Sequence, residues 1–542
     1  MSPFKRINDV SDNNRIRKSW FGLVCVIFLT LIIIPSIFVV FKLFEEWALV
    51  DAVLSDPDAM SVIWSAIYNS FSIALIVTVI DVIVGIPMAW IFVRKNFKGK
   101  QYLDTLMDMP LAFPTAVLGI SVVMFWGAPN GIDIPGLGIV MSPYVMLILL
   151  HIIFTYPYMV RSLSAILEQI EPNYETAAMT LSASRFTAVR TITLPLFRAG
   201  LVTGTILCFA RSLSETGGTF IALQMMNLES TFFTGPTFIA YEKMIGTGAM
   251  GPMILISVLM IVFALLLLVI VKFMMMRFKI PIRKVWPKFG RMISRGGIPK
   301  LKDLFSIAFL ILIVLLPSFY IFMYMTQPIA SIDLGMLLQS TGISFLIAGV
   351  AVGFDIVFGI PIALYVARKR HTIMGRILDN LVNIPLIIPT TALGFSLALF
   401  WGSIYVGDSL GLLMVIMGHI AFTFPLVVRN ITGAVEEVDA SYEEVAMTLG
   451  AKPFQAFSKV LMPIIKSSIV AGAILAFTRS LGETGATIAI SNSVSTVPVY
   501  IMGLINKGNY SEAALCSIIL IVICFILMFA VRMVTNRGAR NA

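Results

Sequence analysis

Charged side chains are scarce in this chain. Lys, Arg, Asp and Glu together make up 13% of its 542 residues, whereas 58% are hydrophobic, and the mean hydropathy is +0.94. A soluble protein usually carries about twice this proportion of charge. The composition therefore excludes a soluble globular fold and predicts a protein that lies within a lipid bilayer.

Residues typical of metal and redox chemistry are also few. The chain has three histidines and four cysteines, and the cysteines lie in or beside hydrophobic runs without close pairing. We expect them to pack as apolar side chains, without a disulfide or a metal site. The sequence has no Gly-x-x-x-x-Gly-Lys-Ser/Thr segment and no catalytic motif of a soluble enzyme. We predict no catalytic residues, no metal site and no ATPase activity in the chain itself.

Long hydrophobic runs take up most of the sequence. Each has about 20 residues or more, the length that an α-helix needs to cross a hydrocarbon core of about 30 Å. The runs lack the alternation of a membrane β-barrel. We predict an all-α integral membrane protein with about twelve transmembrane helices, at 21–42, 63–93, 107–127, 139–161, 194–222, 252–276, 304–325, 338–367, 382–402, 410–430, 463–490 and 513–534.

Most of the positive charge gathers in alternate loops. The net charge of +10 comes from clusters that flank the ends of the runs, at 5–18, 94–100, 272–302, 368–376 and 532–540. The intervening loops are acidic or neutral. By the positive-inside rule, the basic loops and both termini lie in the cytoplasm, and the chain is a multi-pass protein of the inner cell membrane. Charge placed in this way indicates contact with lipid and not with nucleic acid.

The two halves of the sequence repeat each other. The segment YETAAMTLSA at 174–183 returns as YEEVAMTLGA at 442–451, and the flanking residues match at the same spacing. A basic segment rich in Pro and Gly joins the halves. We predict a first repeat at 1–278, a cytoplasmic linker at 279–302 and a second repeat at 303–542. An even number of about six spans in each makes the repeats parallel.

Each half carries a charged motif inside its fifth hydrophobic run. Arg211 and Glu215, and the matching Arg479 and Glu483, are four residues apart, so each pair lies on one helix face. A charge at the bilayer centre costs about 2.5–3.5 kcal/mol on insertion scales, so these side chains should face a bundle interior or a water-filled cavity. We interpret them as residues of the translocation pathway. A structural ion pair that fixes helix packing is the alternative.

A second set of intramembrane acids is also duplicated. Asp81 and Asp355 are each followed by Gly and Pro in the second run of their half. As pathway candidates, they would pair with an Arg of the fifth run or face the cavity. We favour a structural role, in which Gly and Pro allow the helix to kink. His151 and His419 also match, and we expect them to be buried and hydrogen-bonded.

The repeated loop predicts a short amphipathic helix in each half. In the second copy, Val445 and Leu449 are expected on the apolar side and Glu443 and Glu444 on the polar side. Gly450 is expected to end the helix. A second short helical stretch then leads into the fifth run.

The loop resembles the Glu-Ala-Ala loop of the permeases of type I ABC importers. The resemblance is carried by Glu444-Val445-Ala446, by Gly450 four positions beyond, and by Val460-Leu461-Met462-Pro463, and it extends over nearly the whole chain. It implies a fused permease with two six-helix repeats, in which each loop forms a coupling helix that docks on an ATPase subunit. The implied coupling segments are 172–190 and 440–459, with docking residues Glu175, Thr176, Ala177, Ala178 and Ser182, and Glu443, Glu444, Ala446 and Gly450.

The same resemblance implies the partners. These are two copies of a cytoplasmic ABC ATPase subunit, which bind ATP and Mg²⁺, and a solute-binding protein outside the membrane; the chain itself would hold no cofactor. The first copy departs from the pattern, since Thr176 and Ser182 stand where the second has Glu444 and Gly450. We therefore expect unequal coupling, with replacement of Glu444 reducing solute-stimulated ATP hydrolysis more than replacement of Glu175.

The resemblance leaves the solute open. Fused permeases with Leu-Gly-Glu-Thr-Gly-Ala-Thr-like fifth spans, here 481–487, resemble the group that handles ferric iron, thiamine, phosphonates or sulfate, and the fusion favours the first three. A gradient-driven secondary transporter is the alternative function, because parallel halves and intramembrane carboxylates fit that class as well.

Overall fold

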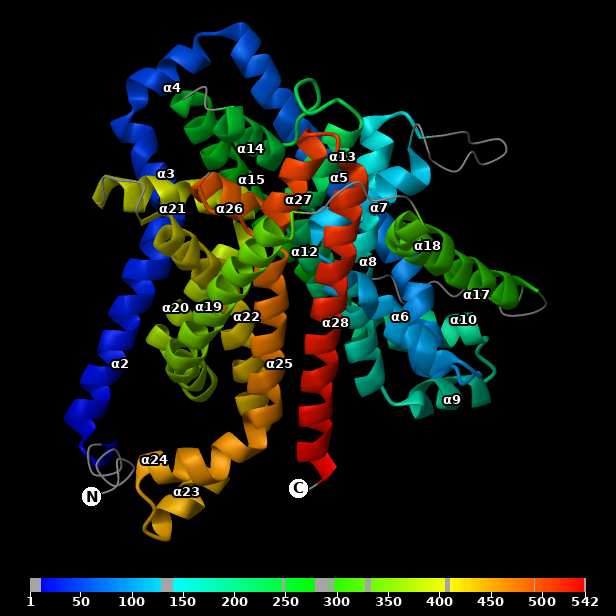
Figure 1. Ribbon diagram of the computed structural model, residues 1–542. Coiled ribbons are helices and arrows are strands. Elements are labelled where there is room, and N and C mark those ends of the chain that lie inside the picture. The colour runs from blue at the N-terminus through cyan, green and yellow to red at the C-terminus, as the bar shows by residue number, and fades with distance from the viewer. Residues whose placement is uncertain are drawn as a thin grey trace.

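Every regular element in the described part of this computed structural model is helical (Figure 1). The structure describes residues 11–127, 140–245, 249–277, 292, 297–326, 333–404, 410–491 and 493–540. The first half contains α2 (Asn14–Phe28), α3 (Ile34–Glu45), α4 (Trp47–Leu54), α5 (Pro57–Arg94), α6 (Lys100–Ala112), α7 (Thr115–Trp126), α8 (Pro143–Gln169), α9 (Pro172–Thr180), α10 (Arg185–Ala188), α11 (Leu194–Leu196), α12 (Arg198–Leu213), α13 (Gly217–Met225), α14 (Gly235–Ile245) and α15 (Met250–Arg277). The second half contains α17 (Ile298–Phe309), α18 (Leu316–Phe319), α19 (Leu334–Lys369), α20 (Ile373–Ile387), α21 (Thr390–Ile404), α22 (Gly411–Glu437), α23 (Ser441–Thr448), α24 (Pro453–Ala456), α25 (Met462–Leu481), α26 (Gly485–Ile490), α27 (Val497–Asn506) and α28 (Tyr510–Arg540).

Short π- and 3₁₀-helical stretches continue several of these helices. The π-helical stretches are η1 (Leu29–Ile33), η2 (Val189–Thr193), η3 (Leu310–Leu315) and η6 (Phe457–Leu461), and η4 (Tyr320–Thr326) is a 3₁₀-helix. After each π-helical stretch, the second residue of the next α-helix is a proline. Because proline lacks an N–H group and its ring crowds the preceding turn, it loosens the regular i→i−4 ladder there.

The helices agree with the predicted hydrophobic runs. Within the described residues, 8 helices are long and apolar enough to cross a membrane, and counting three bent helix pairs as spans raises the number to 11. The twelfth predicted run, 513–534, falls in α28, whose apolar part Tyr510–Ile526 is shorter. The all-α membrane fold predicted from composition is confirmed.

The third run of each half is a pair of helices and not one continuous helix. The chain bends by 107° between α6 and α7 and by 105° between α20 and α21. Phe113 and Ile388, at these bends, have extended backbones. Each precedes a proline, Pro114 or Pro389, and the proline ring disfavours the helical conformation in the residue before it.

The fifth run of each half is also interrupted. The helix α12 ends at Leu213 and α13 begins at Gly217, while α25 ends at Leu481 and α26 begins at Gly485. The predicted runs 194–222 and 463–490 are therefore broken at matching positions, and the Arg–Glu motifs lie at the breaks.

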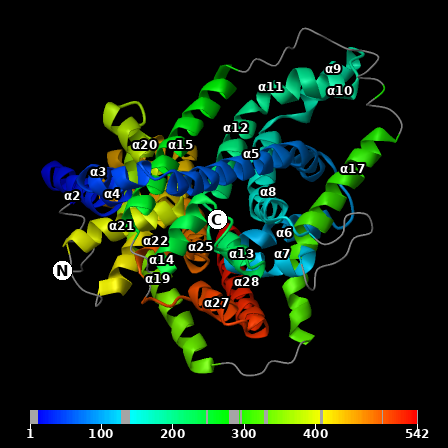
Figure 2. The ribbon, with the colours of Figure 1, turned by 90° about the horizontal axis from the view of Figure 1, so that it is seen from above.

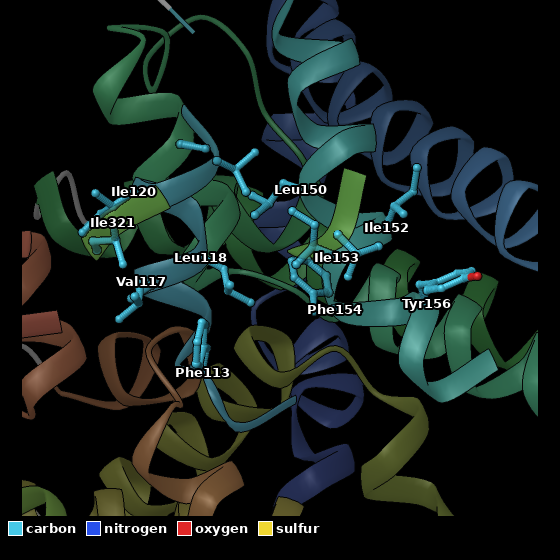
Figure 3. Close-up of a cluster of buried hydrophobic side chains, with 14 of the residues drawn as sticks. Phe113, Val117, Leu118, Ile120, Leu150, Ile152, Ile153, Phe154, Tyr156 and Ile321 are labelled. Atoms are coloured by element: carbon cyan, nitrogen blue, oxygen red, sulfur yellow. The ribbon is translucent and has the colours of Figure 1, made fainter. Parts of the chain in front are cut away.

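The first helix of each half packs against the other half (Figure 2). In α3, the Val39 N–H donates to Ser396 Oγ of α21 at 2.9 Å, and Ser396 Oγ donates to the carbonyl of Pro35 at 2.7 Å. The mirror arrangement joins Ile321 of η4 to Ser121 of α7, again at 2.9 Å. Figure 3 shows Ile321 beside Ile120 of α7. The sequence did not predict this exchange of helices.

Each hydrophobic core draws on both halves. One core combines α5, α7 and α8 with η3, η4, α27 and α28, and the other combines α19 to α22 with α2 to α4, α14 and α15. A ring contact between Phe113 and Phe525 at 6.2 Å illustrates the first core. Neither half completes its core alone, so the two repeats form one interlocked body.

Both coupling segments lie at one end of the molecule, where the chain also begins and ends (Figure 1). We call this the coupling end. Lys452, just before α24, lies 3.7 Å from Asp12 near the start of the described chain. Most of the predicted linker, 279–302, lies outside the described residues, and its last part is helical because α17 begins at Ile298.

Candidate functional site

The two breaks in the fifth runs have nearly the same backbone. Ser214 follows α12 with φ −90° and ψ −2°, and Gly482 follows α25 with φ −89° and ψ −1°. Thr216 and Thr484, which precede the next helices, have φ −125° and −115°. The repeated sequence therefore produces the same interruption twice, with the short helices α13 and α26 on its far side.

The glutamate of each motif caps the helix that follows the break. Glu215 Oε1 accepts the Gly218 N–H at 3.0 Å, and Glu483 Oε1 accepts the Ala486 N–H at 2.8 Å. The first N–H groups of a helix have no partner within it, so a carboxylate there satisfies a donor and favours the positive end of the helix dipole. This capping role was not predicted from the sequence.

The second oxygen of each glutamate binds the arginine of its motif. Arg211 Nη1 lies 2.6 Å from Glu215 Oε2, and Arg479 forms the same ion pair with Glu483. The predicted i,i+4 pairs are thus present in both halves. Each pair connects the helix before the break to the cap of the helix after it.

The arginine is the more exposed member of each pair. The Arg211 and Arg479 side chains are 13% and 19% exposed, whereas those of Glu215 and Glu483 are 3% and 4% exposed. Each guanidinium also lies over a ring of the fourth run, 5.0 Å from Phe154 in the first half and 5.2 Å from the matching ring in the second. In each pair, the guanidinium group therefore lies nearer to the surface between the halves, and the carboxylate is buried deeper.

Both arginines line one small cavity between the halves. Its volume is about 30 Å³, room for about one water molecule. The lining comes from α6, α7, α8 and α12 of the first half and from α25 and the following residue of the second, namely Pro110, Leu111, Phe113, Thr115, Phe154, Tyr158, Arg211, Thr478, Arg479 and Gly482. The space between the two arginines is therefore small in this conformation.

The two breaks touch each other beside this cavity. A Cβ atom at Gly217 would lie 2.6 Å from Thr484 Oγ1, and one at Gly485 would lie 2.5 Å from Thr216 Cβ. The two contacts are images of each other under the sequence repeat. Thr216 also hydrogen-bonds to Thr391 of α21. Only glycine permits such an approach, so the crossing of the broken spans depends on Gly217 and Gly485.

Asp81 and Asp355 lie away from this cavity. Both are fully buried, and Oδ2 of each lies 2.6 Å from a hydroxyl of the fourth run, Thr155 or Thr423. Neither forms an ion pair within the described part of the chain. The structure thus brings Arg211, Glu215, Arg479 and Glu483 together at the centre, and it does not bring the two aspartates there.

The first glutamate of each coupling segment is tied to the end of the second run. Glu175 is buried, accepts from Thr193 Oγ1 at 2.8 Å and lies 3.8 Å from Arg94 of α5. In the second half, Glu443 accepts from Arg368 of α19 at 2.8 Å and 3.1 Å. Arg94 and Arg368 occupy matching positions, and their repetition was the sequence signal that could have identified these anchors.

The apolar side of each coupling segment faces outward. Leu181 and Leu449 are 85% and 83% exposed, and Val445 is exposed as well. In the second segment, Glu443 points to the protein body, where it pairs with Arg368, whereas Val445 and Leu449 do not. A tethered polar side and an exposed apolar side are expected of an element that binds a partner.

The remaining docking candidates are placed as follows. Thr176, Ala177, Ser182, Glu444 and Gly450 are exposed, and Ala178 and Ala446 are partly buried. Ser182 and Gly450 have φ +67° and +91°, and each follows a helix that ends with matching 6→1 hydrogen bonds, from Ala183 N–H to Ala178 O and from Ala451 N–H to Ala446 O. The predicted helix end at Gly450 is thus present, and Ser182 adopts the same conformation without being glycine.

Comparison with known proteins identifies the family. The model of the family "Binding-protein-dependent transport system inner membrane component" matches residues 81–280 and again 359–539. The chain belongs to this family. The permease is fused, because the family unit occurs in each half of one polypeptide, and it has the all-α fold of type I ABC importer permeases.

Curated relatives of this permease have about the length of one half. The molybdenum transport system permease protein ModB of Escherichia coli (strain K12) is 30% identical over 220 residues, which are 40% of this chain and 93% of the relative. The sulfate transport system permease protein CysT of Salmonella typhimurium is 30% identical over 256 residues, 44% of this chain and 92% of the relative. CysW of Escherichia coli (strain K12), also a sulfate transport system permease protein, is 32% identical over 205 residues, with shares of 36% and 69%.

Proposed function

We propose that this permease is the membrane subunit of an ATP-driven importer in which the coupling end lies in the cytoplasm, with both termini. Two copies of an ABC ATPase subunit would each bind one coupling segment, and a solute-binding protein would deliver cargo at the opposite face. The observation that carries this proposal is the pair of outward apolar segments at one end, each anchored by an arginine to the second span of its half. ATP and Mg²⁺ would bind only to the partner subunits.

The pathway, in this proposal, runs between the halves past Arg211 and Arg479, and it is closed where the two breaks cross. Glu215 and Glu483 hold the guanidinium groups toward the cavity. Asp81 and Asp355 support the packing of the second and fourth spans and do not contact the solute. The cavity of about 30 Å³ and the contact of Thr216 with Gly485 support a closed state.

The coupling segments would convert ATP binding into opening of this crossing. Each continues through a short helix into the fifth span, so a displacement of the segment is carried along α12 or α25 to the break. The free energy must come from nucleotide and loaded binding protein having different affinities for the closed and open states.

For the solute, we propose a small oxyanion. The relatives are named for sulfate and molybdenum transport, and the guanidinium groups are the more exposed members of the central pairs. A phosphonate shares this chemistry, whereas ferric iron and thiamine are cations. Of the three solutes favoured by the fusion, a phosphonate-type ion is the one that fits.

Reconstitution of the complex tests the proposal. The permease with its ATPase and binding-protein partners, in proteoliposomes, should accumulate a labelled oxyanion such as sulfate, molybdate or a phosphonate when ATP is supplied. Vesicles that hold only the permease should show no uptake under a proton or sodium gradient. Gradient-driven uptake by the lone chain would instead establish a secondary transporter, and ATP-driven uptake of iron or thiamine would refute the oxyanion assignment.

A further inference from the structure

A buried imidazole lies beside each break. His151 of α8 is 3% exposed. Its Nδ1 lies 2.7 Å from Ser212 Oγ and its Nε2 lies 2.9 Å from Thr219 Oγ1. Ser212 belongs to α12, before the break, and Thr219 belongs to α13, after it. One ring therefore bridges the two helices that the break separates.

The second half has the same bridge. His419 of α22 is 1% exposed, and its Nδ1 and Nε2 lie 2.7 Å from Ser480 Oγ and 3.1 Å from Thr487 Oγ1. These hydroxyl residues flank the break between α25 and α26. The geometry at the two breaks agrees to 0.2 Å or better for both contacts, as 2.9 Å against 3.1 Å is the larger difference.

The ring chemistry suits a bridge between two hydroxyl groups. A neutral imidazole offers one N–H donor and one acceptor nitrogen, and a hydroxyl takes either role, so both contacts are satisfied together. Ser212 and Thr219 are 2% and 0% exposed. Because a buried polar group without a partner costs about 1–3 kcal/mol, separating either hydroxyl from the ring in this environment is unfavourable.

The break itself leaves the relative orientation of the two helices to side chains. Helix ends lack intrahelical partners, so no continuous backbone ladder fixes the angle between α12 and α13. Glu215 caps α13 and pairs with Arg211 of α12. The imidazole supplies a second connection between the two helices, and it comes from a different helix, α8. Two connections in different directions fix the orientation of α13 relative to α12, which one connection would not.

A threonine one turn after each histidine joins the fourth span to the second span. Thr155 Oγ1 lies 2.7 Å from the His151 carbonyl oxygen, to which it can donate. Thr155 Oγ1 also lies 2.6 Å from Asp81 Oδ2 of α5. In the second half, Thr423 is placed in the same way between His419 and Asp355. The bridge thus connects the second and fourth spans to both sides of the broken fifth span.

We propose that His151 and His419 are positioning residues that hold the bend of the fifth spans and thereby the contacts that close the pathway. Thr216 and Gly217 lie between Ser212 and Thr219, so a change in the angle at this break moves the residues that cross the opposite half. The part of this proposal that concerns transport rests on the proposed function, and the part that concerns the bend does not.

Hydrogen–deuterium exchange of the full chain in nanodiscs tests the bend directly. H151F keeps a ring of similar size and removes both nitrogens. We expect exchange in 212–225 to become about tenfold faster, which corresponds to the loss of one buried hydrogen-bonding partner, with a clearly smaller increase in 480–490, where Thr484 contacts Gly217. H419F should show the reverse. H151Q, which restores one donor and one acceptor, should return exchange most of the way to the wild-type rate.

The control is H371F, because His371 is exposed in the loop that follows α19, and it should leave both segments unchanged. Exchange at wild-type rates in H151F, or an equal rise in both halves of each variant, would overturn the proposal.

In the assembled complex, H151F should raise the leak of preloaded sulfate in the absence of ATP by about fivefold or more. Faster exchange without added leak would show that the ring stabilises the fold but not the closed pathway, which also overturns the proposal. Failure of the wild-type complex to move any oxyanion would refute the proposed function and leave the exchange result standing.

Discussion

The two halves agree closely inside the membrane and differ at the coupling end. At the breaks, each Arg–Glu pair, helix cap and imidazole bridge of one half has its image in the other. At the coupling segments, Thr176 and Ser182 of the first half stand opposite Glu444 and Gly450 of the second.

This difference follows from what each region contacts. The two breaks touch each other, so a change in one must be accommodated by the other, and their shapes remain matched. Each coupling segment is anchored to its own half and presents its apolar side to solvent. In our proposal each meets a separate ATPase subunit, and the two segments are free to diverge.

The largest expected effect tests the equality of the breaks. E215A removes both the cap of α13 and the partner of a mostly buried arginine, and E483A does the same in the second half. Breaking such a pair costs about 3 kcal/mol or more, because an unpaired charge is left behind. We expect both variants to lose uptake and to have similar reductions in the free energy of unfolding.

The matched control is E215Q, which keeps an acceptor for the Gly218 N–H but removes the charge. If the hydrogen bond to the Gly218 N–H stabilises the fold independently of the ion pair, E215Q should have a higher free energy of unfolding than E215A. A difference of more than about 2 kcal/mol between E215A and E483A would break the symmetry that we infer, given that equivalent sites usually differ by less.

The next effect tests the inequality of the coupling segments. The Glu444 side chain is exposed in the described structure and is therefore accessible to a partner. E444A should reduce solute-stimulated ATP hydrolysis about tenfold, which corresponds to the loss of one charge-assisted hydrogen bond to the ATPase subunit. T176A should change it little. Equal losses in the two variants would show that the segments dock equivalently.

The sequence suggests a comparison of Glu175 with Glu444, but the structure shows that the residue equivalent to Glu175 is Glu443. Because Glu175 is buried against Arg94 and Thr193, E175A acts on the anchoring of its segment and is matched by E443A. Both should loosen their own segment, as measured by limited proteolysis near 172–190 or 440–459. Resistance of E175A to added cleavage would show that the anchor is dispensable.

A smaller effect concerns the ends of the coupling helices. Ser182 has a left-handed backbone that costs a residue with a side chain about 1 kcal/mol relative to glycine. S182G should therefore slow exchange in 172–183 about fivefold, and G450S should accelerate it in 440–451 by a similar factor. Opposite signs in the two reciprocal variants are the expected result, and equal signs would contradict it.

The smallest effect is a dependence on pH in the second coupling segment. Hydrogen bonds from the backbone N–H and the side chain of Ser441 hold the pKa of Asp439 below its ordinary value. A lowered pKa stabilises the folded segment above the unfolded value of about 3.9, and the contribution is lost as the pH falls through the folded pKa. The protection of 441–448 against exchange, relative to free amides at the same pH, should fall below about pH 4, and D439N should remove this fall.

The sequence by itself determined the class of protein, the duplication and the local motifs. Hydropathy and charge distribution identified the membrane spans, because transfer into lipid depends on the composition of each segment and not on its neighbours. The i,i+4 pairs at Arg211 and Arg479 followed from helix geometry. Pro114 and Pro389 carried the signal for the bends, since the effect of proline on the preceding residue is local.

Only the tertiary structure decided which surfaces meet. Whether α3 packs on its own half or on α21, and whether Glu443 points inward or outward, depends on the joint packing of helices that are all similarly apolar. Lipid is as apolar as those helix surfaces, so hydrophobicity does not select among partners. Specific contacts select instead, such as Ser396 with Pro35 and Thr216 with Gly485, and these join residues far apart in the chain.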